Sequence, residues 1–253
     1  MKLQLWRNAT LVLTIGEKQI LIDPMLGAKG SLGLFPMTGN ELLNPLVDLP
    51  FSEKELQEKL SEIDAVVVTH LHPDHWDGKA VELLDKNTSM ICPEIIAEHI
   101  SQAGFTNVIS IKDTLTWENI SISITEGRHG TGEIREKMGE VHGFVFKTED
   151  TATYIVGDSI WYDGIAAEID KHQPQNIIVA GGAATFVVGD PIIMTAKDII
   201  EVCRHAPDAF VLVTHLEAVS HCKEDRAFIQ RVIHENNLQN RCFVLQDGEV
   251  FSD

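Results

Sequence analysis

The densest group of chemically capable side chains is the segment His70-Leu71-His72-Pro73-Asp74-His75, which places three imidazoles and a carboxylate within six residues. Such nitrogen and oxygen donors suit Zn²⁺, Mn²⁺ or iron. Alternate residues of an extended segment point to the same side, so His70 and His72 can reach one ion. We favour this metal site over a chance grouping of surface histidines.

Three further residues of the same kinds follow β-rich runs: His129 after Ile120–Thr125, Asp158 after Tyr154–Gly157, and His215 after Val211–Thr214. Taken singly, each is as easily interpreted as a turn or capping residue. Ligands of α/β proteins gather beyond the carboxyl ends of strands, so these residues are candidates for the same site.

The elements that must position these residues alternate between strands and helices. A hairpin is predicted from Ala9–Ile15 and Gln19–Asp23, and a buried strand from Ala65–Val68. Between them, Pro24–Pro50 lacks regular periodicity and predicts an ordered, irregular flap. Ser52 and Glu55 form a capping box that begins a helix. Further strands are expected at 89–91, 108–111, 114–117, 120–125, 141–148, 153–156, 176–180, 209–213 and 242–245, and helices at 78–85, 93–103, 165–169, 195–205 and 224–236.

Two β-rich regions, each followed by helices, predict an α/β protein in which two sheets pack face to face with helices outside. The expected architecture is a four-layer αββα sandwich. With no linker or repeat in the sequence, residues 1–253 are predicted to form a single domain, in which residues 24–50 are the flap.

Composition limits the class of partner. Lys and Arg number 20 against 38 Asp and Glu, a formal net charge of −18, which argues against a nucleic-acid partner or an anionic membrane surface. No apolar stretch is long enough for a membrane helix, and Met1–Asn8 has no apolar signal core. The four cysteines are widely scattered and suggest reduced thiols. We therefore expect a cytoplasmic protein with a small-molecule substrate.

The candidate ligands resemble those of the metallo-β-lactamase superfamily, whose H-x-H-x-D-H motif stands here as His70, His72, Asp74 and His75. The likeness runs from Leu11 to about His215 and includes the family's Asp-Pro at Asp23-Pro24. Within the superfamily the chain looks most like the branch of L-ascorbate-6-phosphate lactonase and related metal-dependent hydrolases. The residues that suggest this branch are Asp74-His75-Trp76-Asp77, Asn44-Pro45, Gly181-Gly182-Ala183 and Met194-Thr195.

The resemblance implies a complete set of ligands for two divalent ions, with Zn²⁺ or Mn²⁺ as the expected metals. It assigns His70, His72 and His129 to one ion, Asp74, His75 and His215 to the other, and Asp158 as the bridge between them. One departure lies near the N-terminus, where Arg7-Asn8-Ala9-Thr10 stands in place of the Gly-His-Ala/Ser that relatives often carry. We expect this change to leave the metal site unaffected.

Two ions about 3.5–4 Å apart can share a water and lower its pKa toward neutrality. The predicted function is therefore a dinuclear metal-dependent hydrolase, in which a metal-bridging hydroxide opens a small ester or lactone, with or without a phosphate group. Asp74 is the candidate catalytic residue, as a proton donor to the leaving group. Two alternatives stay open: a phosphodiesterase acting on a small phosphodiester or nucleic acid, and a non-catalytic metal-binding protein.

Several assignments remain open at this level. His221 is an alternative to His215 as a ligand or a substrate contact, and His142 is a candidate second layer around the site. No substrate-binding residue is assigned. The flap is also a candidate subunit contact, so a homo-oligomer is one expectation.

Overall fold

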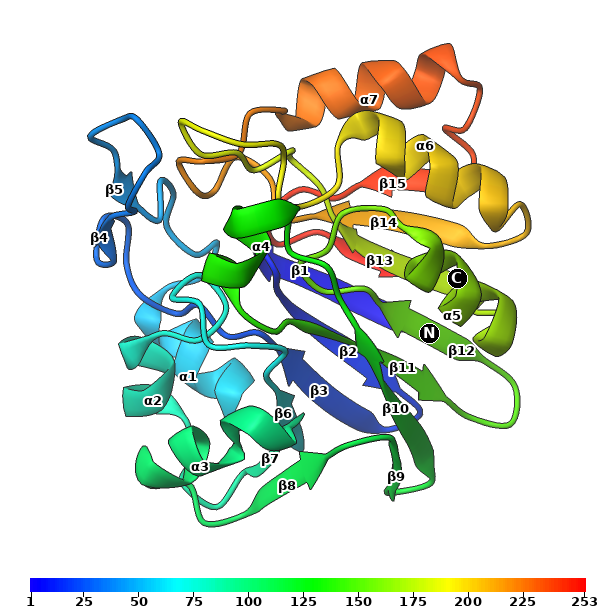
Figure 1. Cartoon of the computed structure of the whole chain (residues 1–253). Coiled ribbons are helices and arrows are strands. Elements are labelled where there is room, and N and C mark those ends of the chain that lie inside the picture. Colours follow the sequence, from blue (N-terminus) through cyan, green and yellow to red (C-terminus); the bar gives the residue numbers. More distant parts are fainter. The chain divides into compact units, whose positions relative to one another are not determined.

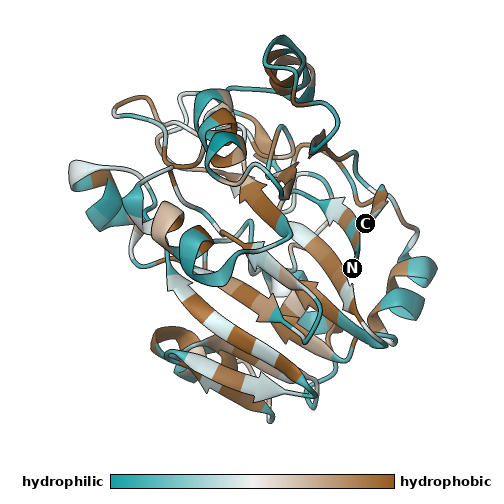
Figure 2. Ribbon diagram, turned by 90° about the vertical axis from the view of Figure 1, so that its right-hand side faces the viewer, coloured by the Kyte–Doolittle hydropathy of each residue, from teal (hydrophilic) through white to brown (hydrophobic).

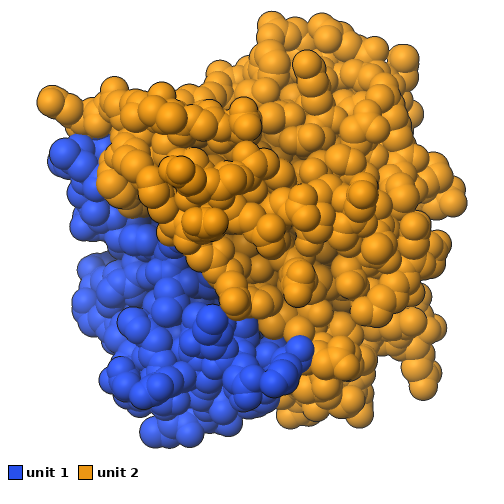
Figure 3. Space-filling view, viewed as in Figure 1, with its two compact units in different colours: residues 1–34, 42–112, 245–253 blue, residues 35–41, 113–244 orange.

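Two seven-stranded sheets and seven helices make up most of the regular structure (Figure 1). The computed structural model describes all residues, Met1–Asp253. These residues divide into two compact units (Figure 3), one of residues 1–34, 42–112 and 245–253 and the other of residues 35–41 and 113–244. The single domain expected for residues 1–253 stays a prediction.

The first unit contains a sheet in the order β16-β1-β2-β3-β6-β7-β8. The strands are β1 (Lys2–Arg7), β2 (Thr10–Ile15), β3 (Lys18–Ile22), β6 (Ala65–Val67), β7 (Ser89–Pro93), β8 (Val108–Ile111) and β16 (Val250–Ser252), and the helices are α1 (Glu53–Leu60), α2 (Gly78–Leu83) and α3 (Glu94–Gln102). One face of the sheet packs against the helices, where Val66 and Met90 share a core with Leu56, Ala80 and Ile100. From β3 onward the pairings β3–β6, β6–β7 and β7–β8 are parallel.

The second unit contains a sheet in the order β15-β14-β13-β12-β11-β10-β9. Its strands are β9 (Thr114–Trp117), β10 (Ile120–Glu126), β11 (His142–Lys147), β12 (Ala152–Ile155), β13 (Asn176–Ala180), β14 (Phe210–Thr214) and β15 (Cys242–Val244), and its helices are α4 (Gly132–Met138), α5 (Asp163–His172), α6 (Ala196–His205) and α7 (Arg226–Glu235). Helices α5, α6 and α7 contribute Ile165, Ile199 and Ile229 to a core shared with Val179 and Val213. Figure 2 shows the strands largely apolar and most of the hydrophilic residues on helices and loops.

Most of the elements expected from the sequence are present within a residue or two of their predicted ends. The capping box of α1 is confirmed, because Ser52 accepts from the Glu55 amide while the Glu55 carboxylate accepts from the Ser52 amide. The segment 24–50 is irregular apart from two short paired strands, β4 (Gly33–Leu34) and β5 (Leu43–Asn44). Five elements, β1, β4, β5, β16 and α4, were not predicted. None of the helices combines the length and apolar character that crossing a bilayer requires.

Arg7 is a fully buried cation at the end of β1, with no exposed surface. Its guanidinium donates to the carbonyl oxygens of Met25, Gly27 and Val47 at 2.7, 2.9 and 2.9 Å, so it fixes both ends of the flap. Burial lowers the pKa of Arg7 to about 10, and the charges of Asp77 and neighbouring carboxylates oppose that shift. The residue is therefore a structural anchor rather than a surface charge.

Replacing Arg7 with Met is expected to lower the free energy of unfolding by about 3–5 kcal/mol, because two buried carbonyls and the part-buried carbonyl of Val47 lose their donor. Urea denaturation measures the loss. Arg7→Lys is the matched control, because it keeps the charge but not the forked geometry. It should lose most of the same stability, and a fully stable lysine variant would show that charge alone matters.

Candidate metal centre

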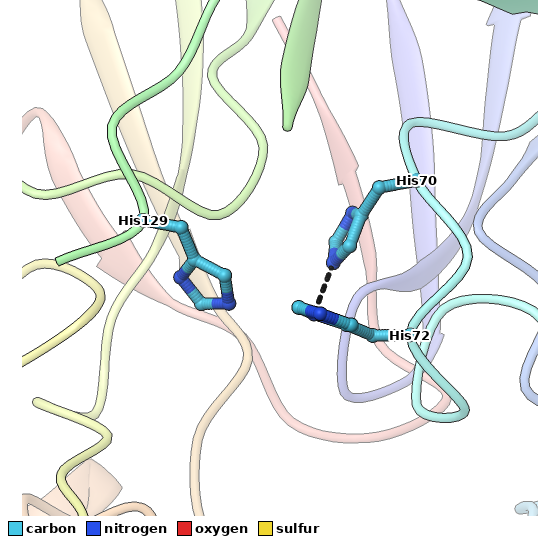
Figure 4. A group of neighbouring side chains, drawn as sticks. All are labelled: His70, His72 and His129. Carbon is cyan, nitrogen blue, oxygen red and sulfur yellow. Dashed lines mark hydrogen bonds between the residues drawn. The ribbon is translucent and has the colours of Figure 1, made fainter. Parts of the chain in front are cut away.

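The histidine-rich segment follows β6 and carries its donors at the carboxyl end of that strand. His70 is buried, and its Nε2 lies 2.9 Å from His72 Nδ1 (Figure 4). Tetrahedral Zn–N bonds of 2.0–2.1 Å separate two nitrogens by about 3.3 Å, so these two atoms need to part only slightly to share an ion. The prediction that His70 and His72, two positions apart, converge is therefore confirmed.

Asp23 holds the neighbouring side chains in place. Its carboxylate accepts from the Thr69 amide at 2.8 Å, from Thr69 Oγ1 at 2.7 Å and from His75 Nδ1 at 2.8 Å. Thr69 Oγ1 also lies 2.9 Å from His70 Nδ1. A carboxylate on Nδ1 sets the tautomer of His75 and leaves Nε2 as its ligand atom, which is the usual support of metal-binding histidines.

Replacing Asp23 with Asn is expected to weaken metal binding by about 10- to 100-fold, because the amide no longer orients His75 or raises its basicity. Competition with a chromophoric chelator measures the dissociation constant. Asp85→Asn, at an exposed carboxylate of the same unit, is the control and should bind metal like the wild type. An unchanged constant for Asp23→Asn would remove Asp23 from the site.

Asn8, in the turn before β2, contacts the backbone of the histidine-rich motif. Its side-chain amide donates to the backbone carbonyl of Asp74 at 3.2 Å. The residue has φ +58°, a left-handed conformation that asparagine tolerates better than most side chains. The turn therefore fixes the backbone that carries the Asp74 carboxylate, which is itself buried.

Asp77 and Trp76 have structural roles beside the motif. Asp77 accepts from the Ala80 amide, as the cap of α2, and from the Gly27 amide of the flap, both at 2.7 Å. Trp76 is buried in the helix-side core, where its ring lies 5.7 Å from that of Phe105. These residues therefore join the motif to the flap and to the core.

The second unit brings three of the predicted residues together at the ends of its own strands. His129 follows β10, Asp158 follows β12 and His215 follows β14, and all three are buried. His129 Nε2 lies 3.6 Å and His215 Nε2 lies 3.4 Å from the same oxygen, Asp158 Oδ2. This group of one carboxylate oxygen and two imidazole nitrogens offers donor atoms of the kind that bind divalent metals.

Hydrogen bonds from neighbouring residues orient His129 and the loop of Asp158, as Asp23 orients His75 in the first unit. His129 Nδ1 donates to the Ile192 carbonyl at 2.8 Å, so Nε2 is its remaining ligand atom. Ser159 Oγ accepts from the Arg128 amide at 2.9 Å and thereby joins the loops that carry His129 and Asp158. Neither Ile192 nor Ser159 had a signal in the sequence, because one contributes a backbone atom and the other is one serine among many.

His221 lies beside His215 in an aromatic setting. Its ring centroid is 6.2 Å from that of His215, at 90°, and it stacks on Phe186 at 6.0 Å while Phe35 packs edge-on at 5.6 Å. The sulfur of Cys222 lies 3.8 Å from His215 Nδ1. His221 is thus part of an apolar wall next to the candidate ligand.

His142 begins β11, close to the loop of Asp158. A side chain on Gly157 would meet the His142 carbonyl oxygen at 2.4 Å, which, with its φ of +73°, explains the glycine before Asp158. Burial lowers the pKa of His142 below its ordinary value of 6.5, against the opposing charges of Glu140 and Glu126.

The depressed pKa of His142 makes stability sensitive to mild acid. In the unfolded chain the imidazole binds its proton at higher pH than in the folded chain, so the free energy of unfolding falls as pH drops below 6.5. Urea denaturation at pH 7 and pH 5 should show a smaller loss for His142→Gln than for the wild type. His234→Gln, at an exposed position of α7, should keep the wild-type loss. Equal losses in all three proteins would contradict the prediction.

The chain thus supplies histidine and aspartate side chains able to bind metal: His70, His72, Asp74, His75, His129, Asp158 and His215. The donor set fits divalent cations of the zinc type, because imidazole nitrogens dominate and each supported imidazole has a fixed tautomer.

Comparison with known proteins agrees with this chemistry. A family model described as a beta-lactamase superfamily domain matches residues 18–216. The UPF0173 protein YddR of Bacillus subtilis (strain 168) is 40% identical over 250 residues, with 97% of each chain covered. A UPF0173 metal-dependent hydrolase of Christiangramia forsetii is 26% identical, covering 86% of this chain and 90% of that one.

Two solved structures resemble this chain over nearly its whole length. A possible metal-dependent hydrolase from Veillonella parvula DSM 2008 superposes with a TM-score of 0.94 at 32% identity, covering 99% of this chain and 98% of that one. An isothiocyanate hydrolase from Delia radicum gut bacteria has a TM-score of 0.93 at 30% identity, covering 100% and 99%. The expected fold, with two sheets flanked by helices, is confirmed. The chain belongs to the metallo-β-lactamase superfamily, within the UPF0173 family of metal-dependent hydrolases.

Proposed function

We propose that the seven residues form one dinuclear centre, in which Asp158 bridges the ions. His70, His72 and His129 hold one ion, and Asp74, His75 and His215 hold the other. The observation that carries the proposal is the approach of His129 Nε2 and His215 Nε2 to a single oxygen of Asp158, since these two histidines are assigned to different ions. Zn²⁺ and Mn²⁺ are the proposed metals, because imidazole and carboxylate donors admit both.

Two divalent cations supply Lewis acidity and bring the pKa of a shared water close to neutrality. The protein's own residues do the rest. Asp23 and the Ile192 carbonyl keep His75 and His129 in the tautomer that binds metal. To Asp74 we assign the return of a proton to the leaving group.

The substrate we propose is a small molecule with an electrophilic carbon, first of all an ester or lactone. A second candidate is an isothiocyanate, whose central carbon is also attacked by water. This candidate is favoured by the likeness, over the whole chain, to the isothiocyanate hydrolase from Delia radicum gut bacteria. A phosphodiesterase acting on a small phosphodiester remains an alternative, and one acting on nucleic acid ranks lower, because a net charge of −18 repels polyanionic substrates.

The test is hydrolysis by the metal-free protein after reconstitution with Zn²⁺ or Mn²⁺, against lactones, sugar-phosphate lactones, isothiocyanates and phosphodiesters. We expect metal-dependent turnover of a lactone or an isothiocyanate, with two ions bound per chain. A wide preference for phosphodiesters would overturn the substrate class. Metal binding without turnover of any of these compounds would favour a non-catalytic metal-binding protein. The cytoplasmic location and the homo-oligomer stay predictions.

A further inference from the structure

The second unit contains a cavity of about 430 Å³ between the loop 186–190, the flap and α4. Its apolar lining comes from Met37, Ile134, Phe186, Val187 and Val188, and we call it the tail pocket. The volume lies in the range of small-molecule sites, which are mostly apolar.

Several apolar side chains that line the tail pocket are exposed, although burial of such side chains would stabilise the fold. Val187 and Val188 are 65% and 74% exposed, and Met37 is 42% exposed. The two backbone segments that carry these side chains are joined, because the Val187 amide donates to the Met37 carbonyl at 2.8 Å. Ordered apolar groups gathered around a cavity are typical of a binding site.

The residues that line the tail pocket are connected to the candidate metal ligands of its own unit in two ways. Thr131, which also lines it, is two residues beyond His129 in the chain. On the other side, Phe186 stacks on His221, whose ring stands next to that of His215. A molecule that reacts beside His129 and His215 can therefore extend an arm of a few carbons along Phe186.

The charges around the tail pocket do not favour a phosphate there. Its ionisable lining residues are Glu133, Lys137 and Asp190, two acids and one base. A phosphate subsite requires a surplus of cationic or amide donors, whereas a neutral hydrocarbon arm gains only from burial.

We propose that the tail pocket binds the uncharged alkyl or aryl substituent of the substrate, so that the protein selects apolar esters, lactones or isothiocyanates over phosphorylated sugar derivatives. This inference rests on the proposed function, whose site it extends. It assigns substrate selection to Phe186, Val187 and Val188.

A chain-length series on the metal-reconstituted protein tests the proposal. Within the class that is turned over, kcat/KM should rise about two- to fourfold for each added methylene until the cavity is filled. Val188→Asp, at an exposed position that folding does not require, should make kcat/KM nearly independent of chain length. Phe186→Ala should make kcat/KM stop rising at a shorter chain. Ile95→Asp, at an exposed apolar residue of α3 in the other unit, should keep the wild-type slope.

A binding measurement keeps the test independent of turnover. Addition of 1-hexanol to methyl-labelled, metal-reconstituted protein should shift the Ile134, Val187 and Val188 methyl resonances saturably, and Val188→Asp should abolish the saturation for Ile134. Absence of saturable shifts, or a flat chain-length series, would overturn the tail pocket even in an active enzyme. A protein that shifts as expected but hydrolyses nothing would instead refute the proposed function alone.

Discussion

Asp158→Asn is expected to lower kcat/KM by about 10³-fold or more and to reduce the bound metal to below two ions per chain. Asp158 is buried, and it presents one oxygen to both His129 Nε2 and His215 Nε2. Loss of the negative charge removes the group that keeps two cations close together. Because such a pair contributes several kcal/mol to the transition state, a thousandfold effect, about 4 kcal/mol, is the expected scale.

Metal analysis by mass spectrometry and steady-state kinetics measure the two losses in the same preparation. Asp150→Asn, at an exposed loop carboxylate of the same unit, is the matched control and should retain metal and rate. Chelation of the wild type should produce the same inactivity, reversed by Zn²⁺ or Mn²⁺. An Asp158→Asn protein with two ions and full activity would remove the bridge from the mechanism.

The sequence predicted the convergence of candidate ligands best where several of them stand close together in the chain. His70 and His72 stand at strand spacing after a run, Ala65–Val67, that is wholly buried. The pattern therefore predicted both the strand and the approach of the two imidazoles. His129, Asp158 and His215 were candidates because each follows a strongly β-forming run, and the resemblance assigned them as ligands. The second unit brings the two histidines to one carboxylate.

The residues that orient the ligands were harder to predict, because their partners are distant in the chain. Asp23 reaches His75 across 52 positions, and His129 binds a carbonyl 63 positions away. A lone aspartate after a strand has no signal that distinguishes such a contact from a turn. Asn8 shows the same limit, since its effect on Asp74 depends on a backbone contact across 66 positions.

The missed elements also have physical reasons. Strand β1 alternates Leu3 and Leu5 with polar residues, but Arg7 at its end looks like a surface charge and is instead buried under three carbonyls. Helix α4 buries no residue and has no side-chain cap, so neither periodicity nor capping marks it in the sequence. It lines the tail pocket through Ile134.

Asp74 is proposed both as a metal ligand and as a proton donor, and two variants are expected to distinguish these roles. At matched metal occupancy, Asp74→Asn should lower kcat by about 10²- to 10⁴-fold, because the amide keeps an oxygen donor but has no proton to transfer. Asp74→Ala should lose at least as much and also bind metal more weakly. Asp85→Asn, at an exposed carboxylate of the same unit, is the matched control and should keep the wild-type kcat.

How the rate loss of Asp74→Asn depends on the leaving group decides whether Asp74 donates a proton. For aryl esters whose phenols are strongly acidic, departure needs no proton, so Asp74→Asn should approach the wild-type rate. For alkyl esters and lactones, whose alkoxides are poor leaving groups, the same variant should show the full loss. The buried position of Asp74, with its Oδ2 4.0 Å from His75 Nε2, suits a carboxyl group that exchanges a proton beside the metal ligands. An equal loss for every leaving group would mean that Asp74 acts through metal binding alone.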